Sequence, residues 1–299
     1  MSAELHCHSL FSIDGSGSPE ELVDVAVENG VTTLGITEHD GYGSLKRAQI
    51  RAAERGINYI SGLELSASFE DDSFHFLAFG FDPQNKNLLE VCKKHQSFYA
   101  INFQPILDKL IERGYDVTKE ELDAALPERY PSHPNPVAAQ WFARDYLVKK
   151  GVFSDAVSAR QITDEIKNEI KKSEYEPKTS TNYIPLDKAI KVVHDAGGVL
   201  LLAHVGLYYP DNLEKQINLL DKILAIGLDG FELYHPSNLG QKHFSELVKY
   251  RDRRDCATSG GSDCHHARST KTAGSGIGEL NVPNYVVDTI EKSLLKIRG

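Results

Sequence analysis

Short apolar segments alternate with amphipathic segments along most of this 299-residue chain, and this alternation limits the possible folds more than any other feature. Strands are predicted within residues 3–10 and at 33–37, 57–63, 74–81, 199–203, 230–233 and 256–259. Helices are predicted between most of them, at 18–29, 44–55, 186–196, 212–226, 240–253 and 283–296. Such a pattern is typical of parallel βα units, so we expect an α/β fold whose seven strands close into a barrel.

The middle of the chain lacks this alternation. Helical stretches dominate there, at 88–113, 119–126 and 137–150, and the segments between them are rich in proline. We expect residues 87–182 to form a helical insertion, or lid, on a barrel made of residues 1–86 and 183–299. The polar segment 171–181 is expected to be a linker or a mobile loop.

Histidines and acidic residues follow nearly every predicted strand. They are His8, Glu38-His39-Asp40, Glu64, His204, His235 and Asp263-Cys264-His265. The carboxyl ends of barrel strands gather at one face, so we expect these side chains to lie together. Strand alternation also puts His6 and His8 on one side of the chain and Cys7 on the other.

A cluster of imidazoles and carboxylates is typical of a site for two or three divalent ions. Because no thiolate joins the predicted set, Mn, Fe or Zn are the suitable metals. Such ions favour hydrolysis at phosphorus. Neither a Gly-x-Ser-x-Gly nucleophile turn in a strand–turn–helix context nor the lysine of a phosphate-binding loop accompanies the glycine-rich segments.

The remaining histidines have ordinary structural interpretations. His95 and His133 fall in the insertion, and His194 is expected at a helix end before Gly197. His243 is expected on a solvated helix face, and His266 is expected to face solvent or to support the site.

Composition narrows the class of partner. The net charge of −10 and the pI of about 5.6 predict no broad basic field for long nucleic acid, although a local groove could bind a short phosphorylated ligand. The four cysteines lack paired spacing, which predicts reduced thiols and a cytoplasmic protein. We expect no signal peptide and no membrane segment, because apolar runs of the required length are absent.

Taken together, the motifs resemble the PHP (polymerase and histidinol phosphatase) superfamily of metal-dependent phosphoesterases. The resemblance is carried by His6-x-His8-Ser9 with Asp14-Gly15, Thr37-Glu38-His39-Asp40, Gly62-x-Glu64, His75, Ala203-His204 and Gly261-Ser262-Asp263-x-His265. The insertion and the segments after it are most similar to the stand-alone bacterial branch. That branch contains 3',5'-nucleotide bisphosphate phosphatases and 5'-to-3' exoribonucleases.

The resemblance implies a distorted (β/α)7 barrel with a helical insertion and three divalent ions, Mn in the first place and Fe or Zn as alternatives. One ion would be held by His6, His8, Glu64 and Asp263; the second by Glu64, His75 and His204; the third by Asp14, His39 and His265. A metal-activated hydroxide would be the nucleophile. Asp40 and His235 are the candidate catalytic residues, for proton transfer or for support of the ligands. The candidate substrate-binding residues are Asp14, His39, Asn102, Arg129 and His133.

Three departures from the family pattern bear on the substrate. Glu38 replaces the usual aspartate, and Val205 replaces the usual proline. The nucleotide-bisphosphate branch also carries arginines early in the insertion to bind a second phosphate, whereas residues 96–102 contain none here. Arg129 and His133 offer at most a partial substitute, which favours a simpler ester.

We therefore expect a phosphoesterase acting on a small phosphate monoester, a nucleotide such as AMP or a nucleoside 3',5'-bisphosphate. The alternatives are a histidinol-phosphate or other metabolite phosphatase, a cyclic phosphodiesterase, and a 5'-to-3' exonuclease on short RNA. A non-catalytic metal-binding protein is the least favoured, because no ligand of the pattern is missing. The oligomeric state stays open.

Overall fold

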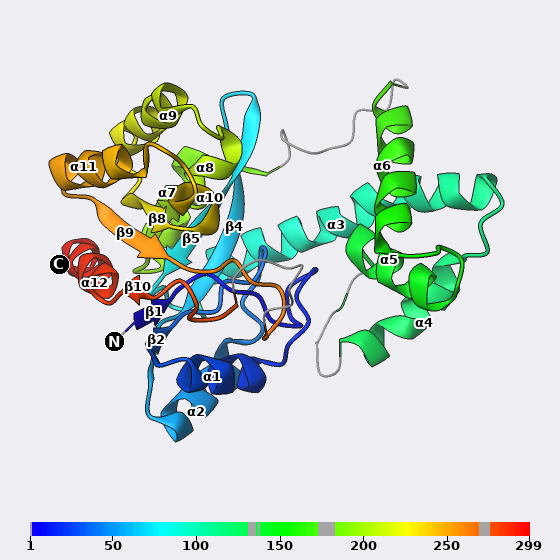
Figure 1. The fold of residues 1–299 in the computed structure, drawn as a ribbon, viewed down its shortest axis with the longest axis horizontal. Helices are drawn as coiled ribbons and strands as arrows, with labels where there is room; N and C mark the ends of the chain where they lie inside the picture. The colour runs from blue at the N-terminus through cyan, green and yellow to red at the C-terminus, as the bar shows by residue number, and fades with distance from the viewer. Residues whose placement is uncertain (1, 131–135, 137, 173–182, 269–275) are drawn as a thin grey trace. The chain divides into compact units, whose positions relative to one another are not determined.

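The computed structural model describes residues 2–130, 136, 138–172, 183–268 and 276–299. The chain divides into two compact units, the first made of Met1–Cys92 with Ile184–Gly299 and the second of Lys93–Tyr183 (Figure 1).

The first unit is an α/β structure with two mixed sheets. The smaller sheet has the order β10 (Val282–Pro283), β1 (Ser2–Glu4), β2 (Val31–Leu34), β3 (Asn58–Tyr59). The larger has the order β6 (Ile184–Pro185), β4 (Gly62–Phe69), β5 (Asp72–Phe79), β7 (Val199–Leu202), β8 (Gly230–Tyr234), β9 (Ala257–Gly260). The neighbours β1–β2–β3 and β7–β8–β9 are parallel, as predicted.

The expectation of parallel units throughout is wrong at β5, which runs antiparallel to both β4 and β7. The chain reverses at Glu70, whose φ of 54° is left-handed, so β4 and β5 form a hairpin without a crossover helix. Two site predictions change with it. Glu64 lies inside β4 rather than after a strand, and His75 lies inside β5, opposite Ser66.

Backbone hydrogen bonds connect the two sheets at both of their seams. On one side the amide of Leu5 donates to the carbonyl of Gly260 (3.0 Å), and that of Asp263 donates to His6 (2.8 Å). On the other side Glu64 donates to Glu38 (3.0 Å), and Asp40 donates to Glu64 (2.8 Å). The segments that follow β1, β2 and β9 are thereby held next to β4.

Helices pack against both sheets of the first unit. They are α1 (Pro19–Glu28), α2 (Leu45–Arg55), α7 (Leu186–Asp195), α8 (Val205–Tyr208), α9 (Leu213–Ala225), α10 (Pro236–Leu239), α11 (Phe244–Arg254) and α12 (Tyr285–Arg298). The helices α1 and α2 pack against β2 and β3. One apolar cluster joins α7 and α9 to β4, β5 and β8, and another joins α12 to β1, β7 and β9. The predicted start of α1 is confirmed, because Ser18 accepts a hydrogen bond from the amide of Glu21 (3.1 Å).

The second unit is helical. It holds α3 (Lys86–Glu112) from Lys93 onward, α4 (Lys119–Arg129), α5 (Gln140–Lys149) and α6 (Ala156–Lys172). Their apolar sides share one core, which includes Phe103, Leu107, Leu122, Phe142 and Ile166. The helix α6 is not among those predicted, and most of the expected linker lies outside the described residues.

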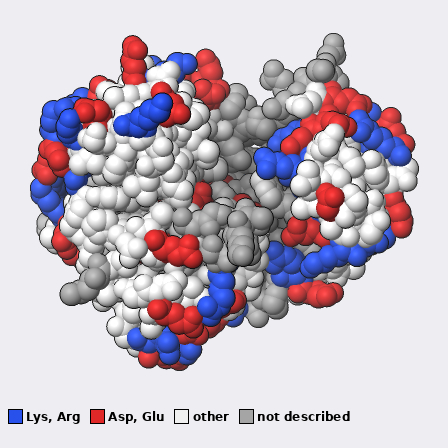
Figure 2. Space-filling view, in the orientation of Figure 1, with Lys and Arg blue, Asp and Glu red and all other residues white. Residues whose placement is uncertain are grey.

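The charged side chains of the visible surface and the four cysteines have ordinary arrangements. Figure 2 shows basic and acidic side chains interspersed on the visible face of each unit. All four cysteines are unpaired. Among the described helices, none combines the length and the apolar character needed to cross a bilayer.

Candidate metal centre

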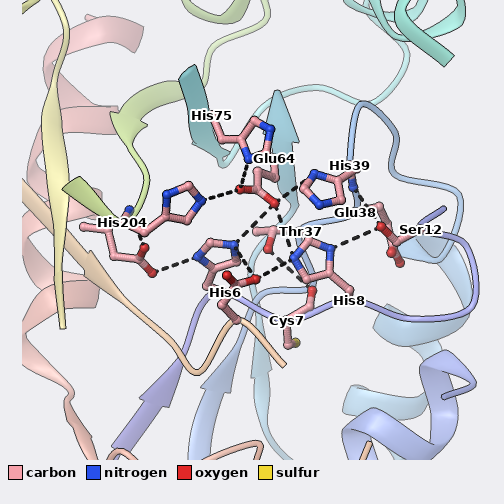
Figure 3. A network of polar contacts seen from close by, with 12 residues as sticks. His6, Cys7, His8, Ser12, Thr37, Glu38, His39, Glu64, His75 and His204 are labelled. Carbon is pink, nitrogen blue, oxygen red and sulfur yellow. Dashed lines mark hydrogen bonds and ion pairs between the residues drawn. The ribbon is translucent and has the colours of Figure 1, made fainter. Parts of the chain in front are cut away.

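The carboxylate of Glu64 is the centre of the site (Figure 3). Its side chain is only 1% exposed, and its strand β4 pairs with β5 on one side and bridges to His39 on the other. Five imidazoles face it: His75 Nδ1 (3.0 Å) and His204 Nε2 (3.1 Å) at Oε1, and His39 Nδ1 (3.1 Å), His8 Nε2 (3.3 Å) and His6 Nε2 (3.4 Å) at Oε2. Such a concentration of ligand-type atoms around one buried carboxylate is typical of a multinuclear metal site.

Two further carboxylates complete the arrangement. Asp263 Oδ1 lies 3.1 Å from His8 Nε2 and 3.4 Å from His6 Nε2. Asp14 Oδ2 lies 3.1 Å from His265 Nε2 and 3.2 Å from His39 Nε2. The left-handed backbone of Asp263 (φ 53°) and of His204 (φ 32°) is uncommon for these residues, and such conformations cluster at functional sites.

Four sets of side chains have ligand atoms within 4.8 Å of one another. They are His6, His8, Glu64, Asp263; His8, Asp14, His39, His265; His39, Glu64, His75; and His6, Glu232, His235. The first set equals the predicted first ion site, and the second adds His8 to the predicted third. In the set around His75, His39 stands where His204 is expected, and His204 instead contacts Glu64 directly.

Buried atoms that make no hydrogen bond give a reason, independent of the motifs, to expect divalent metal ions at this site. His6 Nε2 and Glu64 Oε2 are buried, and neither makes a hydrogen bond. Buried polar atoms are nearly always satisfied, and an unsatisfied one costs about 1–3 kcal/mol. Both atoms point into the cluster, where a metal ion would be the missing partner.

Charge inside the cluster favours a cation. Burial raises the pKa of Glu64, but the imidazoles of His39 and His75 outweigh it and hold the pKa well below its usual range. Burial also raises the pKa of Asp14, and His39 together with His265 reverses the effect. Burial, together with the imidazole of His265, lowers the pKa of His8 to about 4, so His8 is neutral at physiological pH and able to bind a metal.

Two other histidines, His6 and His39, hold a proton instead, because neighbouring carboxylates overcome burial and raise their pKa values. Burial lowers the pKa of His39, but the carboxylates of Glu64 and Asp14 overcome it and raise the pKa to about 10. Without metal, this proton supplies positive charge between the two carboxylates. A metal bound through His39 must displace it.

Glu232 is a functional candidate that the sequence analysis missed. It is fully buried and accepts hydrogen bonds from His6 Nδ1 (2.9 Å) and from the backbone amide of His204 (2.9 Å). Burial lowers the pKa of His6, but the carboxylates of Glu232, Asp263 and Glu64 overcome it and raise the pKa, so a metal must displace the proton of Nε2. The Nδ1–H donated to Glu232 then leaves Nε2 with its lone pair directed at the cluster. The available signal was a single acidic residue inside the apolar strand Phe231-Glu232-Leu233.

Ser12 and Glu38 support the other side of the site. The hydroxyl of Ser12 lies 3.2 Å from His8 Nδ1, donates to Asp14 (2.9 Å) and accepts from the amide of His39 (3.2 Å). Glu38, where the family pattern has aspartate, accepts from the amide (3.1 Å) and the hydroxyl (2.6 Å) of Ser9. It therefore fixes the loop that follows His8.

The two candidate catalytic residues have different surroundings. Asp40 is fully buried, and its two oxygens accept from the amide and the hydroxyl of Ser66, both at 2.8 Å. This geometry favours support of β4 over proton transfer. His235 directs Nε2 towards Asp263 Oδ2 (3.4 Å), while its Nδ1 lies 2.8 Å from Ser237 Oγ.

The predicted substrate-binding residues are divided between the two units. Asp14 and His39 lie in the metal cluster of the first unit. Asn102, on α3, and Arg129, whose guanidinium lies 5.0 Å from the Tyr130 ring centre, belong to the second unit. His133 lies outside the described residues. For Asn102, Arg129 and His133, substrate binding stays a prediction.

The remaining histidines have structural contacts. His194 Nε2 contacts Asp229 (2.9 Å) at the end of α7, and His95 is buried against Phe98 and Tyr183. The expectation of a solvated His243 is wrong, because its ring is partly buried and contacts the Gln216 side chain (3.0 Å). His266 is exposed, as predicted.

Comparisons with known proteins agree with this chemistry. A family model described as the PHP domain matches residues 4–217. A 5'-3' exoribonuclease of Haemophilus influenzae is 29% identical, over 88% of this chain and 89% of its own. A phosphoribosyl 1,2-cyclic phosphate 1,2-diphosphodiesterase of Eggerthella lenta is 30% identical, over 89% and 94%. A 3',5'-nucleoside bisphosphate phosphatase of Chromobacterium violaceum is 28% identical, over 88% and 86%.

A solved structure is similar over almost the whole chain. It is that of a Bifidobacterium adolescentis protein assigned as a metal-dependent phosphoesterase, with a TM-score of 0.76 and 25% identity. The match covers 96% of this chain and 94% of the other.

Proposed function

Because this chain belongs to the PHP domain family, we propose that it is a metal-dependent phosphoesterase that hydrolyses a small phosphorylated substrate, in the first place a nucleotide. The observation that carries the proposal is the group of five imidazoles around the buried carboxylate of Glu64, with His6 Nε2 and Glu64 Oε2 making no hydrogen bond. An ordinary buried ion pair would satisfy these atoms.

The proposed site takes three divalent ions, with Mn the first choice. His6, His8, Glu64 and Asp263 would hold one; Glu64, His75 and His204 the second; Asp14, His39 and His265 the third. When bound, such ions lower the pKa of water and neutralise phosphate oxygens. The geometry permits more than one division of the ligands between the second and third ions. His39, His75 and His204 all contact the carboxylate of Glu64, so His39 could serve either ion.

The chain's own side chains would orient the ligands and move a proton. Glu232 keeps the proton of His6 on Nδ1, and Ser12 holds the loop that carries Asp14. We assign to His235 Nε2 the delivery of a proton to the departing oxygen, because its other nitrogen is held by Ser237 and it lies beside Asp263.

We also infer that the first unit is a distorted (β/α)7 barrel. The backbone hydrogen bonds across both seams support a closed ring in the order β1, β2, β4, β5, β7, β8, β9. A closed ring brings its strand ends to one rim, which explains how residues as distant in sequence as His8 and Asp263 meet.

The substrate follows from chemistry shared by the relatives. The relatives are named for activities on RNA from its 5' end, on a phosphoribosyl cyclic phosphate and on a nucleoside bisphosphate. The absence of arginine from residues 96–102 favours a nucleotide with a single phosphate over a bisphosphate. The Eggerthella lenta relative makes a cyclic phosphodiester the second candidate.

The test combines elemental analysis with product release. The panel holds AMP, a nucleoside 3',5'-bisphosphate, a cyclic sugar phosphate, histidinol phosphate and a short 5'-phosphorylated RNA. We expect two or three metals per chain and hydrolysis of one class, with AMP preferred over the bisphosphate. Chelation should abolish the activity, and added Mn²⁺ should restore it.

A matched pair of variants makes this test specific. Glu64→Gln should lose both metal and activity, because an amide is a weaker ligand and cannot carry the shared negative charge. Glu70→Gln, at the exposed turn of the same hairpin, should keep both. One metal or none in the unsubstituted protein, together with no hydrolysis, would overturn the proposal.

A further inference from the structure

The second unit contains a cavity whose lining includes none of the clustered histidines and carboxylates of the first unit. Its volume is about 160 Å³, and it lies between α3, α5 and α6. Its polar and aromatic lining consists of Tyr99, Asn102, Gln140, Trp141, Lys167 and Tyr183. None of the described residues that line it is acidic.

Two carboxamides line this cavity, those of Asn102 and Gln140. Asn102 Oδ1 is buried and makes no hydrogen bond, and Gln140 is 7% exposed. Each amide offers both donors and an acceptor, so two of them can pair with a ligand edge that alternates donors and acceptors. A buried amide oxygen without a partner is costly, which favours a polar ligand with a donor at Asn102.

The aromatic walls favour a flat ligand. Trp141 is 43% exposed although it lines the cavity, and Tyr99 and Tyr183 add two further rings. A volume of about 160 Å³ is sufficient for one planar heterocycle. Lys167 adds a positive charge to the lining.

We propose that this cavity binds the planar base of a nucleoside or nucleotide. Stacking on aromatic rings and pairing with Asn or Gln amides are the two ways in which proteins recognise unpaired bases. The choice of a base among flat ligands rests on the proposed function. The base belongs either to the substrate or to a separate nucleotide, and both have the same chemistry.

Trp141 makes the test direct, because it is the only tryptophan of the chain. The full-length protein, kept metal-free with a chelator, is titrated with adenosine, AMP and ribose 5-phosphate while tryptophan fluorescence is recorded. We expect saturable quenching by adenosine and AMP and none by ribose 5-phosphate. This readout does not need hydrolysis, so it separates failure of the cavity proposal from failure of the proposed enzyme.

Variants identify the groups involved. Gln140→Ala and Asn102→Ala should each weaken adenosine binding by about 3- to 10-fold, the effect of one lost hydrogen bond. Gln161→Ala, at an exposed position of α6, should leave it unchanged. Circular dichroism and the melting temperature confirm that each variant is folded. Absence of quenching, equal quenching by ribose 5-phosphate, or unchanged binding in both cavity variants would overturn the proposal.

Kinetics then separate the two sources of the base. If the base belongs to the substrate, Gln140→Ala raises KM for AMP and leaves kcat/KM for ribose 5-phosphate unchanged. If it belongs to a separate nucleotide, KM stays constant while the quenching constant still weakens. Both results support a base site in the insertion.

Discussion

Replacing Glu232 by glutamine tests whether this buried carboxylate sets the proton on a metal ligand. The carboxylate accepts two hydrogen bonds, from His6 Nδ1 and from the amide of His204, both at 2.9 Å. A glutamine has only one acceptor oxygen. Because the backbone amide can only donate, the oxygen is expected to remain with His204, and the NH₂ group then faces His6 Nδ1.

This rearrangement has a defined consequence for His6. To accept from the NH₂ group, Nδ1 must give up its proton, which then resides on Nε2. Nε2 is the atom that lies 3.4 Å from both Glu64 and Asp263, and in protonated form it cannot bind a metal. Loss of such support typically lowers metal affinity by about 10- to 100-fold, equivalent to about 1.4 to 2.8 kcal/mol.

The assay is competition for Mn²⁺ between the protein and a chromophoric chelator. Glu232→Gln is compared with the unsubstituted protein and with Glu246→Gln, whose glutamate is exposed on α11 and paired with Lys249. If the glutamine takes the opposite orientation, two donors face each other at His204, and the free energy of unfolding falls by about 1–3 kcal/mol instead. Glu232→Asp, which keeps both acceptor oxygens, should restore part of the affinity.

Metal affinity within twofold of the unsubstituted protein, together with unchanged stability, would refute the reasoning. It would mean that His6 keeps its tautomer without Glu232, or that His6 is not a ligand.

The remaining predictions concern the core and the support of the site. Leu220→Ala, at a fully buried position of α9, should lower the free energy of unfolding by about 2–5 kcal/mol in a urea titration. Gly230→Ala should destabilise the protein strongly, because a Cβ would lie 1.9 Å from the carbonyl oxygen of Ala257. Gly240→Ala should be tolerated, because the nearest atom to its Cβ would be 3.6 Å away. The melting temperatures of the two variants test this difference. Asp40→Asn should lower the melting temperature without shifting the pH–rate profile, and a shifted limb would restore Asp40 as a proton-transfer group.

Local patterns in the sequence predicted local structure well. Ser18 caps α1, and Gly56 ends α2 in a left-handed conformation, because these preferences depend on neighbouring backbone atoms alone. The apolar run 199–203 located β7 to within a residue, since a strand buried on both faces is mostly apolar. The strands β8 and β9 were placed equally closely, although they contain buried polar residues such as Glu232 and Ser259. The hairpin of β4 and β5 was missed because nothing in the segment marks Glu70 as left-handed.

The candidate metal ligands were predicted as residue types, and their partners were not. The family resemblance placed His6, Glu64 and Asp263 at one site, and the structure brings these three together. Sequence spacing could not indicate Glu232, because a carboxylate gains its role only from the atoms that meet it in the folded chain. Nor could it show that Asp40 is fully engaged by Ser66.

The amino-acid order alone thus determined the α/β class, the helical interruption and the set of imidazoles and carboxylates available for chemistry. Those properties follow from short-range preferences and from residue identity. Which oxygen faces which nitrogen, which atoms are left without partners, and whether a carboxylate lies among cations or amides depended on the folded chain. These contacts join residues such as His8 and Asp263, which meet only when the strands are assembled and water is excluded.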